Sequence, residues 1–292
     1  MKIGFIGLGT MGLPMAANIL HKSGEGAVGF DVVQAQLDRF CAMGGTVAES
    51  AEQVFRCCDI TFLSLPNNEL VQANLELGIR TAQKGAVVVD LSSSHPAVIQ
   101  SWKAAAEAAG VGLVDCPVSG GEKGAEAGTL ASMCGGREED VERVRPYLEM
   151  FSASVIHMGP LGCGYAAKLA NNMIIGTEIA VIAEALNFAR LAGLDQQKLF
   201  EAIRHGGAAS CVLEVKGPKM IQKDYAASSR LSIHLKDQHN AMRLAEDTGA
   251  YMPLCAMATE MMEKLEREGR GTDDVAAVLD LFERESRPEN EQ

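Results

Sequence analysis

The chain has 292 residues, of which 47% are hydrophobic and 22% are charged, as in an ordinary soluble globular protein. This length predicts one large domain or two smaller ones, with ample apolar residues for a core. Thirty glycines with only nine prolines exclude a collagen-like or proline-rich disordered chain. The formal net charge is −12, and no run of basic residues occurs, which argues against nucleic acid or membrane lipid as a partner.

The cysteines and the N-terminus bear on the compartment. None of the eight cysteines forms a C-x-x-C pair, and several lie in apolar runs, where a free cysteine behaves as a small hydrophobe. Gly7, Gly9 and Gly12 interrupt an N-terminus that otherwise resembles a signal peptide. No apolar run approaches the ~20 residues that a membrane helix needs. We therefore expect a reduced, cytoplasmic location without a targeting segment.

In the first half of the chain, short β-branched segments alternate with helical patterns. The predicted strands are 2–6, 27–31, 60–64, 87–90, 113–117, 132–135 and 155–158. The predicted helices are 11–23, 33–43, 51–57, 96–109 and 138–150. Strands separated by helices of this length predict βαβ units and a mostly parallel sheet that is covered on both faces.

The second half is helical only. One long helix is predicted over 165–192, and at about 40 Å it is longer than one small domain needs. Further helical patterns follow at 196–204, 232–248, 253–268 and 273–285. The predicted fold is an α/β dinucleotide-binding domain of the Rossmann type over 1–163, then the interdomain helix and an all-α C-terminal domain over 164–292.

A glycine-rich motif lies between the first predicted strand and the first predicted helix. Gly7-Leu8-Gly9-Thr10-Met11-Gly12 has the pattern G-x-G-x-x-G, in which the glycines allow a tight turn, a close pyrophosphate and close helix packing. Asp31 ends the second predicted strand, nineteen residues after Gly12, near the spacing expected for a carboxylate on the adenine ribose. The alternative reading is a turn without a ligand.

Asp31 also predicts which dinucleotide binds. A carboxylate at this place hydrogen-bonds a free 2′-hydroxyl and repels a 2′-phosphate. No Arg or Lys follows Asp31 until Arg39. We therefore expect NAD rather than NADP, although a solvated aspartate at the end of a strand is the simpler alternative.

Two further segments carry candidate chemistry. The turn Ser119-Gly120-Gly121 follows a predicted strand and exposes a hydroxyl and backbone N–H groups that can hold a carboxylate. Lys168 and Asn172 lie four residues apart on the long helix and share one face among small and apolar neighbours. Burial of such groups without a polar partner is costly, so we expect them to have a function there, although a lone helical lysine is usually solvated.

These motifs, in this order, resemble those of the β-hydroxyacid dehydrogenase family, typified by 3-hydroxyisobutyrate dehydrogenase and tartronate semialdehyde reductase. The matching segments begin with Gly4-Phe5-Ile6-Gly7-Leu8-Gly9 and extend through Pro117-Val118-Ser119-Gly120-Gly121 and Gly164-x-x-x-Lys168-x-x-Asn171-Asn172 to Lys236-Asp237. The resemblance covers nearly the whole chain, and several spaced motifs are far more specific than any one of them.

The resemblance implies a role for each of these segments. Lys168 would be the catalytic acid or base, Asn172 would position the substrate, and Ser119, Gly120 and Gly121 would bind its carboxylate. Cofactor contacts are implied at Leu65, Pro66, Ser93 and Lys236, beside the glycine loop. The family also implies a homodimer or homotetramer and no metal, and the histidines form no H-x-x-x-H pair.

The expected activity is hydride transfer between NAD(H) and a small β-hydroxy carboxylate, interconverting it with its semialdehyde or keto form. One departure from the family pattern leaves the size of the substrate open. Many relatives carry a serine-rich stretch that includes a tryptophan, and this chain has Gly206-Gly207-Ala208-Ala209-Ser210-Cys211 at that place. The alternatives are an NADP(H)-preferring semialdehyde reductase of the same family, a catalytically silent dinucleotide-binding module, and a helical assembly protein.

Overall fold

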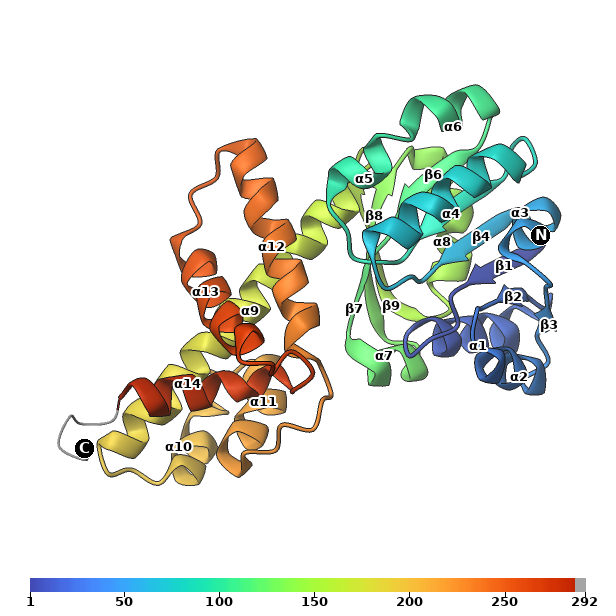
Figure 1. The fold of residues 1–292 in the computed structure, drawn as a ribbon. Helices are drawn as coiled ribbons and strands as arrows, with labels where there is room; N and C mark the ends of the chain where they lie inside the picture. Colours follow the sequence, from blue (N-terminus) through green and yellow to red (C-terminus); the bar gives the residue numbers. More distant parts are fainter. Residues whose placement is uncertain (287–292) are drawn as a thin grey trace. The chain divides into compact units, whose positions relative to one another are not determined.

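The protein divides into two compact units, and the boundary lies between Lys168 and Leu169. The computed structural model describes residues 1–286. Strands and helices alternate as far as residue 159, and the rest of the described chain is helical (Figure 1). An N-terminal Rossmann-like α/β unit, a long helix and a helical C-terminal unit were expected from the sequence, and this architecture is confirmed.

The N-terminal unit is built on one twisted sheet. Its strands are β1 (Ile3–Ile6), β2 (Val28–Phe30), β3 (Thr46–Val47), β4 (Ile60–Leu63), β5 (Val87–Asp90), β6 (Gly112–Asp115), β7 (Val118–Ser119), β8 (Leu130–Gly136) and β9 (Ser152–Gly159). The order is β3-β2-β1-β4-β5-β6-β8-β7, and β9 pairs with β8. Strands β1 to β6 run parallel, whereas β8 is antiparallel to β6. The strand order reverses between β1 and β4, and ligands of such sheets bind at the carboxyl ends of these strands.

The helices of this unit cover both faces of the sheet. They are α1 (Gly12–Ser23), α2 (Gln34–Ala42), α3 (Ala51–Cys57), α4 (Asn68–Thr81), α5 (Pro96–Gln100), α6 (Lys103–Ala109), α7 (Gly121–Ala127) and α8 (Glu138–Leu148). One core cluster joins α1, α2 and α8 to the sheet, and another joins α3, α4, α5 and α6 to it. Both faces are therefore buried, as in other parallel sheets.

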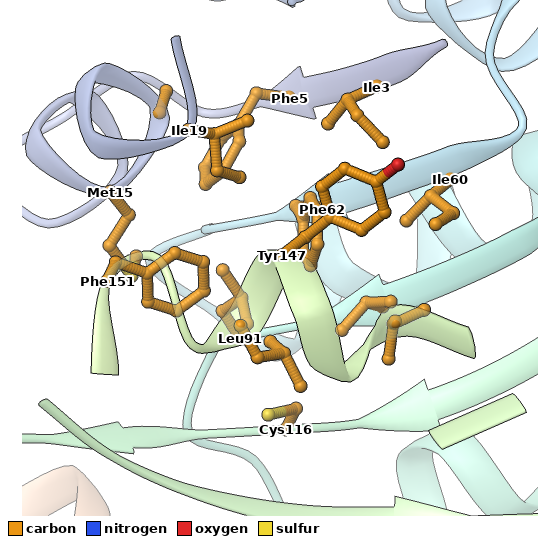
Figure 2. Close-up of a cluster of buried hydrophobic side chains, with 14 of the residues drawn as sticks. Ile3, Phe5, Met15, Ile19, Ile60, Phe62, Leu91, Cys116, Tyr147 and Phe151 are labelled. Carbon is orange, nitrogen blue, oxygen red and sulfur yellow. The ribbon is translucent and has the colours of Figure 1, made fainter. Parts of the chain in front are cut away.

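Alternate residues of each strand enter different cores. Phe5 and Phe62 point to the face that α1 and α8 cover, where they stack with ring centroids 5.6 Å apart (Figure 2). Phe151 meets Phe62 edge to face at 6.1 Å. The next residues along the same strands, Ile6 and Leu63, enter the opposite core. This period of two follows from the extended backbone and accounts for the continuous apolar runs of the sequence.

The C-terminal unit is a group of helices with its own core. Helix α9 (Cys163–Leu191) begins in the N-terminal unit and continues into this one, followed by α10 (Gln196–Ile203), α11 (Cys211–Gln222), α12 (Leu231–Thr248), α13 (Pro253–Arg267), the 3₁₀ helix η1 (Val275–Ala277) and α14 (Val278–Glu285). By length and composition α9 could cross a membrane. Within the described residues 33% of the apolar window that meets this test is buried, and Ile179, Ala183 and Leu186 of α9 pack among the other helices.

The sequence predictions missed five elements and merged two. Strands β3 and β7 have two residues each, and helix α7 has seven, too short for a periodic pattern. Helix α4 begins at Asn68, after the N-cap Asn67, whose side chain accepts a hydrogen bond from the N–H of Leu70. Gly217 and Pro218 interrupt the helical pattern of α11. The single helix predicted over 96–109 is two helices, because Ser101 and Trp102 separate α5 from α6.

Candidate active site

The glycine loop connects β1 to α1 at the carboxyl edge of the sheet. Gly7 has a φ of +90°, and a Cβ there would lie 2.2 Å from the carbonyl oxygen of Ser64. A Cβ at Gly12 would lie 1.9 Å from the carbonyl oxygen of Gly7, so helix and strand pack as closely as the motif predicts. A Cβ at Gly9 would have no neighbour within 4 Å among the described residues. Open space therefore adjoins the middle glycine, where a pyrophosphate would approach.

Asp31 lies beside this loop. Its Oδ2 accepts the N–H of Leu8 at 2.7 Å, and its Oδ1 accepts the N–H of Val33 at 2.8 Å. The two bonds fix the carboxylate at the end of β2. Each carboxylate oxygen can accept more than one bond, so Asp31 retains capacity for ribose hydroxyls. The structure thus brings together the glycine loop and the aspartate that the sequence paired by spacing alone.

The residues of this edge fit a dinucleotide. Within the described chain, no side chain caps the start of α1, and its first turn contains no acidic residue. The N–H groups of that turn are then available to an anion, which the helix dipole also favours. Together with the space at Gly9, these features match a pyrophosphate beside the glycine loop.

The loops after β4 and β5 carry the other predicted cofactor contacts of this unit. The N–H of Leu65 donates to Oγ of Ser92 at 2.9 Å, and the N–H of Ser92 donates to Oδ1 of Asp90 at 2.9 Å. Pro66 is exposed and Ser93 is half-buried. The two loops are therefore joined to each other by hydrogen bonds at the carboxyl ends of their strands.

The predicted carboxylate-binding turn follows β7. Ser119 ends that strand and pairs with Ala131 of β8. Gly120 has a φ of +132°, which few other residues adopt, and a Cβ there would lie 3.0 Å from Leu130. Helix α7 begins at Gly121, so the segment is a turn that leads into a short helix rather than a free loop.

Lys168 and Asn172 lie one turn apart on α9, as predicted. Lys168 is half-buried and is the last residue of the N-terminal unit, whereas Asn172 is buried in the C-terminal unit. The side-chain amide of Asn172 donates to Oδ2 of Asp237 at 2.7 Å and accepts from the amide of Asn171 at 2.9 Å. Lys236 lies 3.3 Å from the other oxygen of Asp237. Asp237 therefore connects Asn172 to the predicted cofactor residue Lys236.

The sequence interpretation gave no role to Asp237 or to its neighbour Gln238. The side-chain amide of Gln238 donates to the backbone carbonyl of Asn172 at 2.8 Å, and its Oε1 accepts the thiol of Cys255 at 2.9 Å. A Cβ at Gly176 would lie 2.0 Å from Nε2 of Gln238, so only glycine admits this side chain. The available signal was a run of five polar residues from Lys236 to Asn240, which is too long for one exposed face of a helix.

The remaining features of the site concern metals and thiols. In residues 1–286, no group of three His, Cys, Asp or Glu side chains could hold a metal ion. The eight cysteines are free, and four of them are buried.

Known families match the chain in succession. Residues 2–159 match the family described as the NAD binding domain of 6-phosphogluconate dehydrogenase. Residues 162–282 match the family described as NAD-binding of NADP-dependent 3-hydroxyisobutyrate dehydrogenase.

Relatives are similar over the same length. The chain is 38% identical to 2-(hydroxymethyl)glutarate dehydrogenase of Eubacterium barkeri, over 97% of this chain and 95% of that protein. It is 34% identical to 2-hydroxy-3-oxopropionate reductase of Escherichia coli K12, over 97% of each. The structure of Mycobacterium tuberculosis 3-hydroxyisobutyrate dehydrogenase with L-serine matches with a TM-score of 0.88 and 32% identity, over 96% of this chain and 98% of that one.

The same relatives therefore match both units, and the two units follow each other in the same order in those proteins. The chain belongs to the β-hydroxyacid dehydrogenase family typified by 3-hydroxyisobutyrate dehydrogenase, and it is an NAD(P)-dependent β-hydroxyacid dehydrogenase or reductase.

Proposed function

We propose that the protein is an NAD-dependent dehydrogenase of 3-hydroxy carboxylates in which Lys168 is the general acid and base. The observation that carries this proposal is the pairing of Lys168 with Asn172 one helical turn later, where Asp237 and Gln238 hold Asn172 by its side chain and its carbonyl. A helical amide fixed at two points is pre-organised for binding, which is how positioning residues favour a reaction.

The relatives support one chemical class of substrate. Three compounds can be compared: 2-(hydroxymethyl)glutarate and 2-hydroxy-3-oxopropionate, from the names of the relatives, and the L-serine of the solved structure. In each of them, C2 carries a carboxylate and also a neighbouring carbon that bears an oxygen. The three compounds differ in the other substituent on C2, the carbon to which both of these groups are attached. We infer a substrate with a carboxylate and a hydroxymethyl or aldehyde group on one carbon.

The residues divide the work as follows. Bound nicotinamide dinucleotide supplies the electron-pair acceptor or donor. Ser119 and the N–H groups of Gly120 and Gly121 hold the substrate carboxylate, because a hydroxyl and adjacent amides suit an anion. The ammonium group of Lys168 stabilises negative charge on the reacting oxygen and exchanges the proton with it. Asn172 orients that oxygen.

NAD is the proposed cofactor because of Asp31. Its carboxylate accepts two backbone N–H groups at the end of β2, which holds a negative charge where a 2′-phosphate would lie. The next two residues, Val32 and Val33, offer no positive charge. We expect a higher kcat/KM with NAD than with NADP for every active substrate. The reverse order would favour the NADP(H)-preferring reductase.

Replacement of Lys168 by alanine tests the catalytic role. Loss of the group that exchanges the proton should lower kcat by about 100-fold or more, while the Kd for NADH, measured by fluorescence titration, changes little. Lys198→Ala, an exposed lysine on α10, is the matched control and should retain full kcat. An unchanged kcat in Lys168→Ala would remove Lys168 from the mechanism.

The substrate assay uses a panel of C3 to C6 hydroxy acids and semialdehydes, followed by NADH absorbance. Activity restricted to compounds with the shared carboxylate and hydroxymethyl or aldehyde group is expected. A flat trace over the whole panel with tight NADH binding would indicate a silent dinucleotide-binding module. Failure to bind NADH would indicate an assembly protein.

The oligomer and the compartment are also part of the proposal. On α9, Ile174, Val181 and Phe188 are spaced by seven residues and are 56%, 56% and 69% exposed. Such spacing forms one apolar stripe on a helix, which supports a homodimer or homotetramer. The free cysteines support a reducing, cytoplasmic location.

A further inference from the structure

Two buried carboxyl groups lie side by side at the carboxyl edge of the sheet. Asp90 ends β5 and Asp115 ends β6, and the two residues are register partners in the parallel ladder. Both are fully buried. Buried carboxylates are costly unless they are hydrogen-bonded, so the partners of this pair indicate what it does.

The partners belong to the start of α9. Oδ1 of Asp115 accepts the N–H of Gly162 at 2.7 Å, and Oδ2 accepts the N–H of Tyr165 at 2.8 Å. The hydroxyl of Tyr165 donates to Oδ2 of Asp90. Tyr165 is itself fully buried. One residue of α9 is thus held by its backbone on one strand and by its side chain on the next.

The first turn of α9 also lies directly against the sheet backbone. A Cβ at Gly164 would be 2.3 Å from the carbonyl oxygen of Met133, and a Cβ at Gly135 would be 2.7 Å from the N–H nitrogen of Gly164. This contact leaves the helix start little freedom to rotate or shift.

The same carboxyl groups connect to the predicted cofactor and substrate loops. Asp90 accepts the N–H of Ser92, whose hydroxyl accepts the N–H of Leu65. Asp115 ends β6, and the short link Cys116-Pro117 leads from it to β7, which ends at Ser119. Within the N-terminal unit, Lys168 therefore follows by three residues a tyrosine whose hydrogen-bond partners, Asp90 and Asp115, end the strands that lead to these two loops.

We propose that Asp90, Tyr165 and Asp115 are positioning residues that hold the start of α9 on the sheet and thereby place Lys168 for proton exchange. This inference rests on the proposed role of Lys168. A shift of the first turn would displace the ammonium group, and misplacement by about 1 Å can lower a rate about 100-fold. Neither carboxyl group touches the reacting atoms in this proposal.

The electrostatic cost of the pair supports this assignment. The pKa of Asp115 is raised to about 7, chiefly by burial and to a smaller extent by the neighbouring Asp90, against the lowering effect of the N–H groups of Gly162 and Tyr165. A hydrophobic pair at these positions would avoid this cost. The two hydrogen-bond acceptors at the helix start are what an apolar pair could not provide.

Tyr165→Phe and Asp115→Asn test the proposal. Phenylalanine keeps the buried ring and removes only the hydroxyl, so this variant tests the tie to Asp90 with little change in packing. The control is Asp140→Asn, a buried carboxylate on α8 that accepts a bond from Arg137 and packs at the opposite end of β6. All proteins are assayed well below their melting temperatures, with kcat, KM and the Kd for NADH measured separately.

We expect kcat to fall about 10- to 100-fold in Tyr165→Phe and Asp115→Asn, with the Kd for NADH within about twofold and kcat unchanged in Asp140→Asn. In a Lys168→Ala background the same substitutions should have almost no further effect, because they act through the missing group. A structural role alone would give equal losses in both backgrounds.

Three results would overturn the inference: an unchanged kcat in folded Tyr165→Phe, an equal loss of kcat in the control, or full additivity with Lys168→Ala. Failure of the proposed function is a separate result, since it requires that Lys168→Ala itself retain kcat. An active Lys168→Ala enzyme therefore overturns both proposals, whereas an inactive one with an unaffected Tyr165→Phe enzyme overturns only this inference.

Discussion

At the scale of single residues, the glycine loop contains two glycines that are needed for different reasons. A Cβ at Gly12 would overlap the carbonyl of Gly7 at 1.9 Å, whereas a Cβ at Gly9 would meet no described atom within 4 Å. Gly12 is required by the fold of the protein itself. Gly9 is dispensable for the fold and would be required only by a bound pyrophosphate.

This difference gives a paired prediction. Gly12→Ala should lower the free energy of unfolding by about 3 kcal/mol or more, because backbone atoms cannot move aside cheaply. Gly9→Ala should retain the melting temperature but weaken NADH binding by about tenfold or more, since its methyl group would occupy the phosphate position. Calorimetry and fluorescence titration measure the two quantities. Normal NADH affinity in Gly9→Ala would place the pyrophosphate elsewhere.

Asn172 shows how a catalytic candidate is held by side chains rather than by its own helix. Asp237 holds its amide, and Gln238 holds its backbone carbonyl through the space that Gly176 leaves. These contacts come from a different helix, α12. An asparagine on an exposed helix would instead rotate freely and lose entropy on binding the substrate.

At the scale of elements, α9 is the helix on which the proposed chemistry depends. Its first turn is held by β5 and β6, and its later turns form the core of the helical unit. The candidate lysine, Lys168, therefore lies within one turn of Tyr165, where the helix is fixed to the sheet. This arrangement suits a site built on rigid elements rather than on loops.

The buried carboxyl at the start of α9 predicts a pH dependence of stability. The folded-state pKa of Asp115 is about 7, above the ordinary value of 3.8. Between pH 3.8 and pH 7 the folded protein therefore binds more protons at Asp115 than the unfolded chain does. The resulting contribution to the free energy of unfolding is present at pH 4 and is lost as the pH rises through 7. The full difference corresponds to about 4 kcal/mol.

Asp115→Asn removes the titrating carboxyl group, so a comparison with the native protein measures its contribution to stability. The melting temperature of the variant relative to the native protein should rise as the pH increases from 5 to 8.5. Circular dichroism at each pH gives the comparison. A constant difference between Asp115→Asn and the native protein over this range would contradict a raised pKa.

At the scale of the whole molecule, association is expected to involve α9. Phe188 is 69% exposed in the apolar stripe with Ile174 and Val181, and solvent exposure of such a stripe is unfavourable. Phe188→Ser should therefore convert an oligomer to smaller species in sedimentation velocity. Tyr251→Ser, which removes an aromatic residue that is 90% exposed outside the stripe, is the control. Monomeric native protein would remove the stripe from consideration.

Much of the fold and part of the site could be predicted because they depend on local pattern. The glycine loop, the strand ending in Asp31 and the pair Lys168 and Asn172 each lie within one turn, one βαβ unit or one helix. Periods of 2 and 3.6 residues place such groups without knowledge of the rest of the chain. The short elements β3, β7 and α7 were not predicted, because they have too few residues to show a periodic pattern.

What the sequence by itself determined, then, is the class of fold, the dinucleotide motif and the face of the helix that carries the candidate lysine. Only the tertiary structure decided how these groups are held. Asn172 and Asp237 are 65 residues apart in the chain, and Tyr165 and Asp90 are 75 apart. Such contacts depend on strand register and helix packing, and many long-range interactions set these jointly, so no local pattern records them.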